Sequence, residues 1–239
     1  MATPAQRTNT WILDEWYDQS VAGTTGGYTE IYEFFGWGHN QYSGGVGNNS
    51  TANVSSPIQI PGTTWGSEVS GNTGISFNIK TDGTLWGWGS NSYGQLAQND
   101  LTLRSSPVQI PGSWSKISGT GRHSAAIKTD GTLWVWGKNT NGVLGINSPV
   151  NTRYSSPVQI PGTTWATGVD SARMASRCTF AIKTDGTMWG WGRNDTGELA
   201  QNNVQPAYSS PVQIPGTTWS QHTGAYYATH AAIKTDGTL

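Results

Sequence analysis

The stretch IKTDGT at residues 79–84 runs directly into LWGWG at residues 85–89, and this pair of segments decides the fold. The hexapeptide recurs at residues 127–132, 182–187 and 233–238, so its lysines are 48, 55 and 51 residues apart. A regular spacing of this order indicates a repeat architecture. The chain is therefore predicted to use one structural unit about four times.

A second block keeps the same spacing. The sequence SSP(V/I)QIPG starts at residues 55, 105, 155 and 209, and a tryptophan follows each copy. The tryptophan strand recurs at 133–137 and 188–192, whereas its fourth copy, FFGWG, stands at the front, at residues 34–38. We expect residues 31–60 to complete the last blade of a ring closed by N- and C-terminal strands. The alternative is a fragment of a six- or seven-bladed ring.

Turn chemistry places the strands of one unit. Asp-Gly between two apolar segments predicts a tight type I′ hairpin. The repeated aspartates are therefore turn residues, and the lysines two positions earlier are expected to be solvated. One unit is predicted to form strands at 114–118, 124–128, 132–137 and 157–160. Because proline has no N–H to donate, it is expected at a strand start or on an outer edge. The sequence thus predicts an all-β propeller of about four four-stranded blades over residues 31–239. The four turn aspartates are Asp82, Asp130, Asp185 and Asp236.

Composition narrows the class of protein. Of the 239 residues, 11% are charged, 32 are glycine and 13 are tryptophan. Charged residues make up roughly 25% of an average domain, so a long helical bundle is excluded. The formal net charge of −1 disfavours nucleic acid as a partner. Neither a signal peptide nor a membrane span is predicted, so we expect a soluble protein without a membrane partner.

One unit resembles a known repeat. Its segments are WSKISG at 114–119, HSAAI at 123–127, DG at 130–131, WVWGKN at 134–139, NGVLG at 141–145 and Pro157. In order and spacing they resemble one regulator of chromosome condensation repeat, and the resemblance covers roughly residues 32–239. It implies a β-propeller, usually of seven blades, and a broader family role in nucleotide exchange or chromatin binding. The family histidine is present at His123, whereas Ile75, Cys178 and Thr229 stand at its position in the other units.

A second resemblance concerns the biological setting. The block SSPVQIPGTTW is similar to repeats in predicted structural proteins of aquatic bacteriophages. It implies a virion component associated with capsid, tail or fibre, so the expected location is the virion, with a cytoplasmic or extracellular location as the alternative.

The tryptophans fall into two groups. Eleven recur at repeat positions and are predicted to pack between blades, where a large ring buries the most surface. The other two lie in residues 1–30, which carry a net charge of −3 against +2 for residues 31–239. This N-terminal arm either docks onto a partner or packs under the propeller. Its candidate docking residues are Trp11, Ile12, Leu13, Trp16 and Tyr17, and the structural repeat tryptophans include Trp37, Trp86, Trp88, Trp134, Trp136, Trp189 and Trp191.

Unequal loops suggest where a partner binds. Residues 166–181 form a 16-residue segment against 13, 12 and 13 residues in the equivalent segments. Near-identical blades joined by unequal loops are typical of a scaffold that presents a binding face. Asp170, Arg173 and Arg177 in this segment are therefore candidate partner-binding residues, and the loop at 140–154 is a second candidate.

Catalysis has little support in the sequence. The histidines lack a paired metal-binding spacing, no Gly-x-Ser-x-Gly elbow occurs, and the glycine-rich stretches lack the lysine of a phosphate loop. Cys178 is either a reactive thiol beside two arginines or a small buried residue, and it has no disulfide partner. We therefore predict no catalytic residue, metal or cofactor.

The sequence favours a non-enzymatic structural and interaction module. Its expected partners are other virion proteins or a further copy of itself, and the arm anchors it. The alternative is a carbohydrate-binding adhesin or host-receptor-binding propeller that stacks a host surface glycan on Tyr93, Tyr154 and Tyr208.

Overall fold

The computed structural model describes residues 32–167, 172–175, 177–222 and 229–235, all within one compact unit, Tyr32–Leu239. The regular elements there are β-strands, apart from the single 3₁₀ turn η1 (Thr140–Gly142). The predicted arm residues 11–17 and the turn residue Asp236 lie outside the described residues. Among the described residues, no helix has the length and apolar character needed to cross a membrane.

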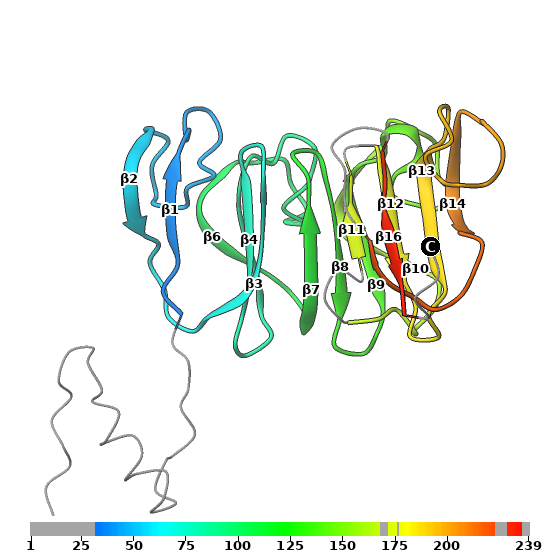
Figure 1. Cartoon of the computed structure of the whole chain (residues 1–239). Coiled ribbons are helices and arrows are strands. Elements are labelled where there is room, and N and C mark those ends of the chain that lie inside the picture. Colours follow the sequence, from blue (N-terminus) through cyan, green and yellow to red (C-terminus); the bar gives the residue numbers. More distant parts are fainter. Residues whose placement is uncertain (1–31, 168–171, 176, 223–228, 236–239) are drawn as a thin grey trace, which may run out of the picture. The chain divides into compact units, whose positions relative to one another are not determined.

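Three antiparallel four-stranded sheets form complete blades, which confirms the predicted architecture (Figure 1). Within each blade, every strand pairs with the strand that follows it in sequence. Blade A is β3 (Trp65–Asn72), β4 (Ile75–Lys80), β5 (Leu85–Gly89) and β6 (Arg104–Ile110); blade B is β7 (Trp114–Gly119), β8 (His123–Lys128), β9 (Leu133–Lys138) and β10 (Arg153–Ile160); blade C is β11 (Ala172–Met174), β12 (Cys178–Ile182), β13 (Met188–Arg193) and β14 (Ala207–Gln213).

Two half-blades flank these sheets. β1 (Phe35–Gly38) pairs with β2 (Val54–Gln59), and β15 (Trp219–His222) pairs with β16 (Ala232–Lys234), each as a separate two-stranded sheet. In chain order, the half-blade β1–β2 precedes blade A and the half-blade β15–β16 follows blade C. Among the described residues, β1–β2 and β15–β16 are not joined in one sheet, so the predicted completion of the last blade by residues 31–60 is not seen there.

The prolines and glycines of the repeat occupy the positions that their chemistry favours. Three of the repeat prolines, Pro107, Pro157 and Pro211, lie in the fourth strand at the outer edge of a blade, as predicted, and Pro57 lies in β2 of the first half-blade. The register shifts next to these prolines, for example between Tyr154 and Val158. Gly89 has a φ of +107°, and a Cβ there would lie 2.2 Å from the carbonyl oxygen of Gly74. The glycines of the tryptophan strand thus allow the strands of a blade to approach closely.

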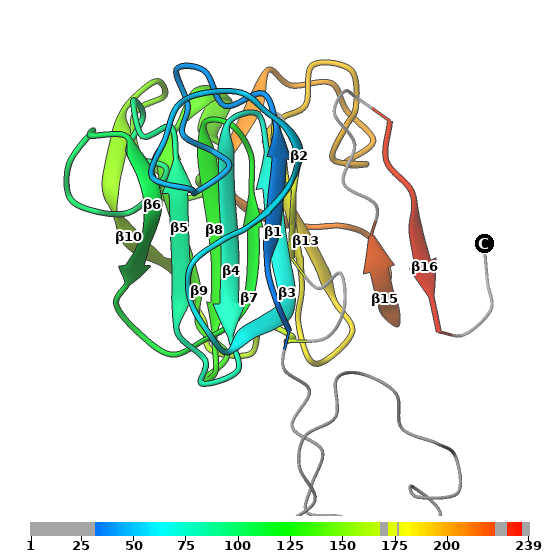
Figure 2. The ribbon, with the colours of Figure 1, turned by 90° about the vertical axis from the view of Figure 1, so that its left-hand side faces the viewer.

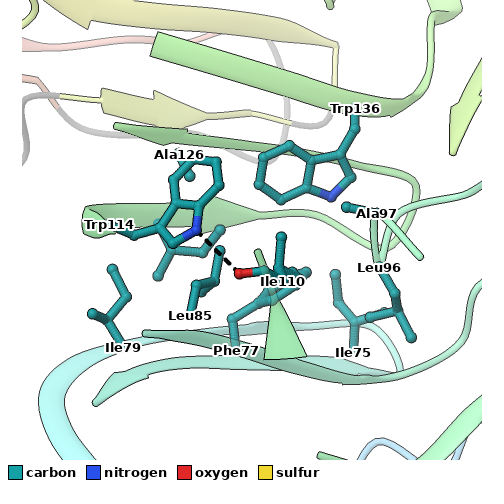
Figure 3. Packing of buried hydrophobic residues seen from close by; sticks show 11 residues of the cluster. Ile75, Phe77, Ile79, Leu85, Leu96, Ala97, Ile110, Trp114, Ala126 and Trp136 are labelled. Carbon is teal, nitrogen blue, oxygen red and sulfur yellow. Dashed lines mark hydrogen bonds between the residues drawn. The ribbon is translucent and has the colours of Figure 1, made fainter. Parts of the chain in front are cut away.

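The cores lie between successive blades. Phe77 and Leu85 of blade A pack in one buried cluster with Trp114 and Trp136 of blade B (Figure 3). The Trp114 indole nitrogen donates to the carbonyl oxygen of Ile110 at 3.2 Å, the dashed contact in Figure 3. The two tryptophan rings meet edge to face, with centroids 5.9 Å apart. Each blade therefore has part of its core supplied by its neighbour.

A recurring clamp fixes each blade to the loop of the blade before it. Trp136 in β9 donates its indole N–H to the carbonyl oxygen of Gln95 at 2.7 Å, and the hydroxyl of Ser124 donates to the same oxygen at 3.2 Å. The same bonds recur at both other boundaries, from Trp88 to Gly45 at 2.9 Å and from Trp191 to Val143 at 2.8 Å.

Candidate functional site

The two ends of the strands differ in their connections. Short Lys-Thr-Asp-Gly hairpins lie at one end, which we call the hairpin face, and long loops lie at the other, which we call the loop face (Figure 2). The loop face comprises the loops at 39–53, 90–103, 139–152 and 194–206, together with the turns at 73–74 and 120–122 and with Ala175 and Arg177. Its long loops differ in sequence from one repeat to the next, whereas the hairpins repeat Lys-Thr-Asp-Gly.

The hairpin face is built on the predicted aspartate turns, but the turn type differs from the prediction. Only the glycine has a positive φ, +80° at Gly83, so these are three-residue loops with a type I turn and a glycine bulge rather than type I′ turns. Asp82 Oδ1 accepts from the Thr84 amide at 2.9 Å and from its hydroxyl at 2.6 Å. Asp130 and Asp185 repeat the arrangement. These hydrogen bonds lower the pKa of all three carboxyls.

The sequence predicted that the repeated lysines are solvated. The structure instead places them against tryptophan rings. Lys128 Nζ lies 4.1 Å from the Trp134 ring centroid and 5.3 Å from that of Trp114. Lys80 and Lys183 lie between equivalent pairs of tryptophan rings. Cation–π attraction therefore gives the lysine a structural role, linking the first and third strands of each blade.

On the loop face, buried asparagines organise the backbone. Asn91 Oδ1 accepts from the Leu96 amide at 2.9 Å, and its Nδ2 donates to the Asp100 carbonyl oxygen at 3.0 Å. Asn139 and Asn194 make equivalent bonds across their own loops, and all three are buried. A loop closed across its base in this way holds its outer residues in fixed positions. Asn139 belongs to the WVWGKN segment of the repeat, but the sequence alone did not indicate this role.

Arginines are concentrated on the loop face, where some are paired with acids. Arg104 contacts Asp100 at 2.6 Å. Arg193 contacts Asp195 and also Glu198, the latter at 3.5 Å. The described part of the chain contains no group of three or more His, Cys, Asp or Glu residues that could hold a metal ion. The described loop face is thus a surface on which arginines lie beside acidic side chains.

The predicted partner-binding segment is only partly described. Asp170 lies outside the described residues, and Arg173 is placed by its backbone in β11, opposite Phe180. Arg177 is exposed just before β12, and its carbonyl oxygen accepts from the Arg193 amide at 2.9 Å. Arg177 therefore belongs to the loop face, and the partner role of all three residues stays a prediction.

The tryptophans predicted to be structural differ in burial. Trp88, Trp136 and Trp191 are buried, whereas their strand neighbours, Trp86, Trp134 and Trp189, are half-buried beside the lysines. Trp37 in β1 stands at the position of Trp88 but is 64% exposed. Trp88 packs on the loop of a preceding half-blade, and no equivalent loop precedes β1 within the described residues. The prediction that the repeat tryptophans pack between blades is therefore wrong for Trp37.

His123 and Cys178, which have acid–base and nucleophilic potential, are both buried. Burial, with a further contribution from the charge of Arg122, lowers the pKa of His123 to about 4. Burial, and then the negative charge of Glu198, raises the pKa of the Cys178 thiol to about 12. The thiol hydrogen-bonds the Arg193 carbonyl oxygen at 3.3 Å. Of the two interpretations of Cys178, the small buried residue fits these surroundings.

Comparison with known families agrees with this geometry. Residues 82–127 and 130–180 match the regulator of chromosome condensation (RCC1) repeat, and a second RCC1 repeat description matches residues 114–143. Residues 82–180 therefore carry RCC1 repeats, which confirms the predicted repeat over this part of the chain.

Solved structures show the same fold. The chain is similar to human WBSCR16, with 23% identity and a TM-score of 0.67 over 81% of this chain and 51% of that one. It is also similar to Prp20p from Saccharomyces cerevisiae, which was studied for its binding to Gsp1p and histones, with 18% identity and a TM-score of 0.70 over 84% and 51%. Yeast RCC1 (Prp20) bound to Kap60 gives 18% and 0.69 over 84% and 50%. The chain thus spans about half the length of each of these proteins.

Proposed function

Because the chain carries RCC1 repeats, we propose that the protein is a non-enzymatic interaction module whose loop face binds a partner protein. One observation carries this proposal: near-identical clamped blades present loops of different sequence at one end of the strands. A rigid scaffold with variable loops is the usual arrangement of a binding surface. The Prp20 structures, which concern binding to Gsp1p, histones and Kap60, support a protein as the kind of partner.

The described chemistry favours binding over catalysis. The turn aspartates are held by threonines, and His123 and Cys178 are buried with pKa values that keep them uncharged at neutral pH. Catalytic acids, bases and nucleophiles generally need access to substrate and a pKa near the working pH. These groups serve the scaffold instead.

A crosslinking experiment tests the loop face directly. A photoreactive phenylalanine analogue replaces Ser92 or Thr196 on the loop face, and Thr81 or Thr184 on the hairpin face provides the matched exposed control. The proposal predicts that the loop-face positions crosslink to one defined partner protein and the hairpin-face positions do not. Crosslinks to that partner from the hairpin face alone would contradict it.

We propose a bacteriophage virion as the setting, with residues 1–30 as the anchor. The support is the SSPVQIPGTTW spelling and the aromatic, acidic character of the arm, which contains Trp11, Ile12, Leu13, Trp16 and Tyr17. Deleting residues 1–20 should then abolish incorporation into particles. Incorporation at the normal level would show that the arm is not the anchor.

The alternative function is glycan binding by exposed tyrosines. Their positions weaken it, because Tyr154 and Tyr208 are half-buried against hydrophobic clusters and Tyr93 is half-buried among cations. A stacking platform needs a ring face open to the sugar. Saturable binding on a glycan array that a Tyr93→Ala variant loses would favour the adhesin over the protein-binding module.

A further inference from the structure

Three cations surround one aromatic ring on the loop face. The Tyr93 centroid lies 5.1 Å from Lys138 Nζ, 5.4 Å from Arg153 Cζ and 5.9 Å from Arg122 Cζ. Tyr93 comes from the loop after β5 in blade A, whereas the three cations come from strand ends and a turn of blade B. We call these four residues the Tyr93 cluster. It lies at the boundary between two blades, where the chain has brought residues distant in sequence together.

The backbone holds the cluster in place. The Tyr93 amide donates to Gln95 Oε1 at 2.8 Å, and Gln95 Nε2 donates to the carbonyl oxygen of Gly121 at 3.1 Å, so one side chain ties the Tyr93 loop to the turn that holds Arg122. The Lys138 amide donates to the Arg122 carbonyl oxygen at 2.8 Å. Arg153 and Lys138 are direct partners across β10 and β9. These bonds fix the backbone positions from which the three cationic side chains extend.

This arrangement has an electrostatic cost. Like charges directly opposite each other on paired strands are destabilising. Within the described residues, none of the three cations forms an ion pair with a carboxylate. The acids of the described loop face are engaged elsewhere, Asp100 with Arg104 and the pair Asp195 and Glu198 with Arg193. Attraction to the tyrosine ring offsets only part of the repulsion.

The residues of the Tyr93 cluster are not repeated at the equivalent positions of the other blade boundaries. At the boundary of blades B and C, the position of Tyr93 is taken by Asn141 and that of Lys138 by Arg193. The acids that neutralise Arg193 are replaced beside Lys138 by Thr140 and Val143. At the boundary before blade A, the positions of the three cations hold no charge; they are taken by Gly74, Ser90 and Leu103. At the boundary of blades B and C, Arg177 and Ala207 take the places of Arg122 and Arg153, so three cations without acids occur at one of the three boundaries compared.

We propose that the Tyr93 cluster binds a carboxylate-bearing segment of the partner protein, an acidic peptide rich in Glu or Asp. This deepens the proposed function, on which it rests, by naming the chemistry of the partner. Two guanidinium groups can each hold a carboxylate through paired N–H donors, and the lysine supplies a third positive charge. Arg122 and Arg153 are exposed and Lys138 is half-buried, so a peptide can reach all three.

The charge distribution favours a peptide over nucleic acid. A duplex presents a long row of phosphates and requires an extended positive track. Here the chain has a net charge of −1, and Arg104 and Arg193 on the same face are already paired with carboxylates. A compact set of three charges matches two or three carboxylates of a short acidic segment.

Fluorescence anisotropy with a labelled hexaglutamate peptide tests the proposal on the full 239-residue chain. Binding should be saturable at low ionic strength and weaken with added salt, and a hexaglutamine peptide should not bind. The double variant R122Q/R153Q should weaken binding at least tenfold. The control K80Q/K183Q removes the same charge from the hairpin face and should change binding less than twofold. Far-UV circular dichroism and thermal melts establish that both variants are folded.

Three results would overturn the proposal: equal binding of hexaglutamine, an equal loss in the two double variants, or tighter binding of a 20-base-pair DNA duplex than of hexaglutamate. The outcome is separable from that of the proposed function. If Ser92 crosslinks to a partner protein while R122Q/R153Q binds hexaglutamate normally, the loop face is the interaction face and the Tyr93 cluster is not its acidic-peptide site. If only hairpin-face positions crosslink, the proposed function fails whatever the peptide result.

Discussion

Replacing Trp136 by phenylalanine tests the clamp that joins blade B to blade A. Trp136 is fully buried, and its indole N–H donates to the Gln95 carbonyl oxygen at 2.7 Å. Phenylalanine keeps an aromatic ring in the core but removes this donor. Loss of one buried hydrogen bond costs about 1 kcal/mol. The carbonyl oxygen still accepts from the Ser124 hydroxyl at 3.2 Å, so it is not left without a partner.

The phenylalanine ring is smaller than the indole, so the substitution also leaves a cavity that lowers the free energy of unfolding. A residual cavity of about 40 Å³ at about 24 cal/mol per Å³ costs a further ~1 kcal/mol. Together with lost apolar burial, the expected destabilisation is about 2–3 kcal/mol. The matched control is Trp134→Phe, two residues earlier on β9, where the ring is half-buried and its N–H donates to the Thr132 hydroxyl at 2.8 Å. That change should cost about 1 kcal/mol or less.

Urea unfolding followed by far-UV circular dichroism compares the two variants with the parent chain. The clamp predicts a clearly lower midpoint for Trp136→Phe than for Trp134→Phe. Equal midpoints would refute the reasoning, because they would show that the bond to the preceding loop adds nothing beyond the packing of an average ring.

Three further predictions concern buried and paired groups. Because the pKa of His123 is about 4 in the folded state against an ordinary 6.5, stability should be full above pH 6.5 and fall as the pH drops toward 4, by about 3 kcal/mol in total. His123→Cys, which installs the residue of blade C, should flatten the pH profile of the thermal midpoint in that range; an unchanged profile would assign the effect to other groups. Since the pKa of the Cys178 thiol is raised to about 12, iodoacetamide at pH 8 should alkylate the native chain more than ~10-fold more slowly than the urea-unfolded chain, and equal rates would contradict its burial. Lys128→Gln should lower stability by about 1–2 kcal/mol in urea unfolding, whereas Lys128→Arg should retain most of it; identical losses would argue against cation–π contact with Trp134.

Much of the scaffold could be predicted from the sequence because the same strand and turn residues recur at equivalent positions in each repeat. The spacing of the IKTDGT and SSPVQIPG blocks predicted four strands per blade, and the prolines were correctly assigned to strand starts or outer edges. The two-residue alternation placed Trp86 and Trp88 on one face of a strand. It could not show that Trp88 is buried against a preceding loop while Trp86 covers Lys80, because that depends on the neighbouring sheet.

Other features depend on local geometry or on contacts between blades. The Asp82-Gly83 pair fits several turn types, and the choice rests on the preceding Thr81, which makes the loop three residues long. Ring closure by residues 31–60 followed from repeat order, whereas the structure keeps β1–β2 and β15–β16 in separate sheets. The Tyr93 cluster joins residues 29 to 60 positions apart across a blade boundary, so no local motif could have revealed it.

The central claim is that the repeat builds a rigid scaffold and that the Tyr93 cluster, which is not repeated at the other boundaries, binds the partner. Hydrogen–deuterium exchange of the full chain with and without hexaglutamate tests this claim most directly. The account predicts that the peptide slows exchange at residues 90–95, 119–123 and 138–139 on the loop face, and leaves the Lys-Thr-Asp-Gly hairpins unchanged. Slower exchange at the hairpins, with no change around Tyr93, would contradict it.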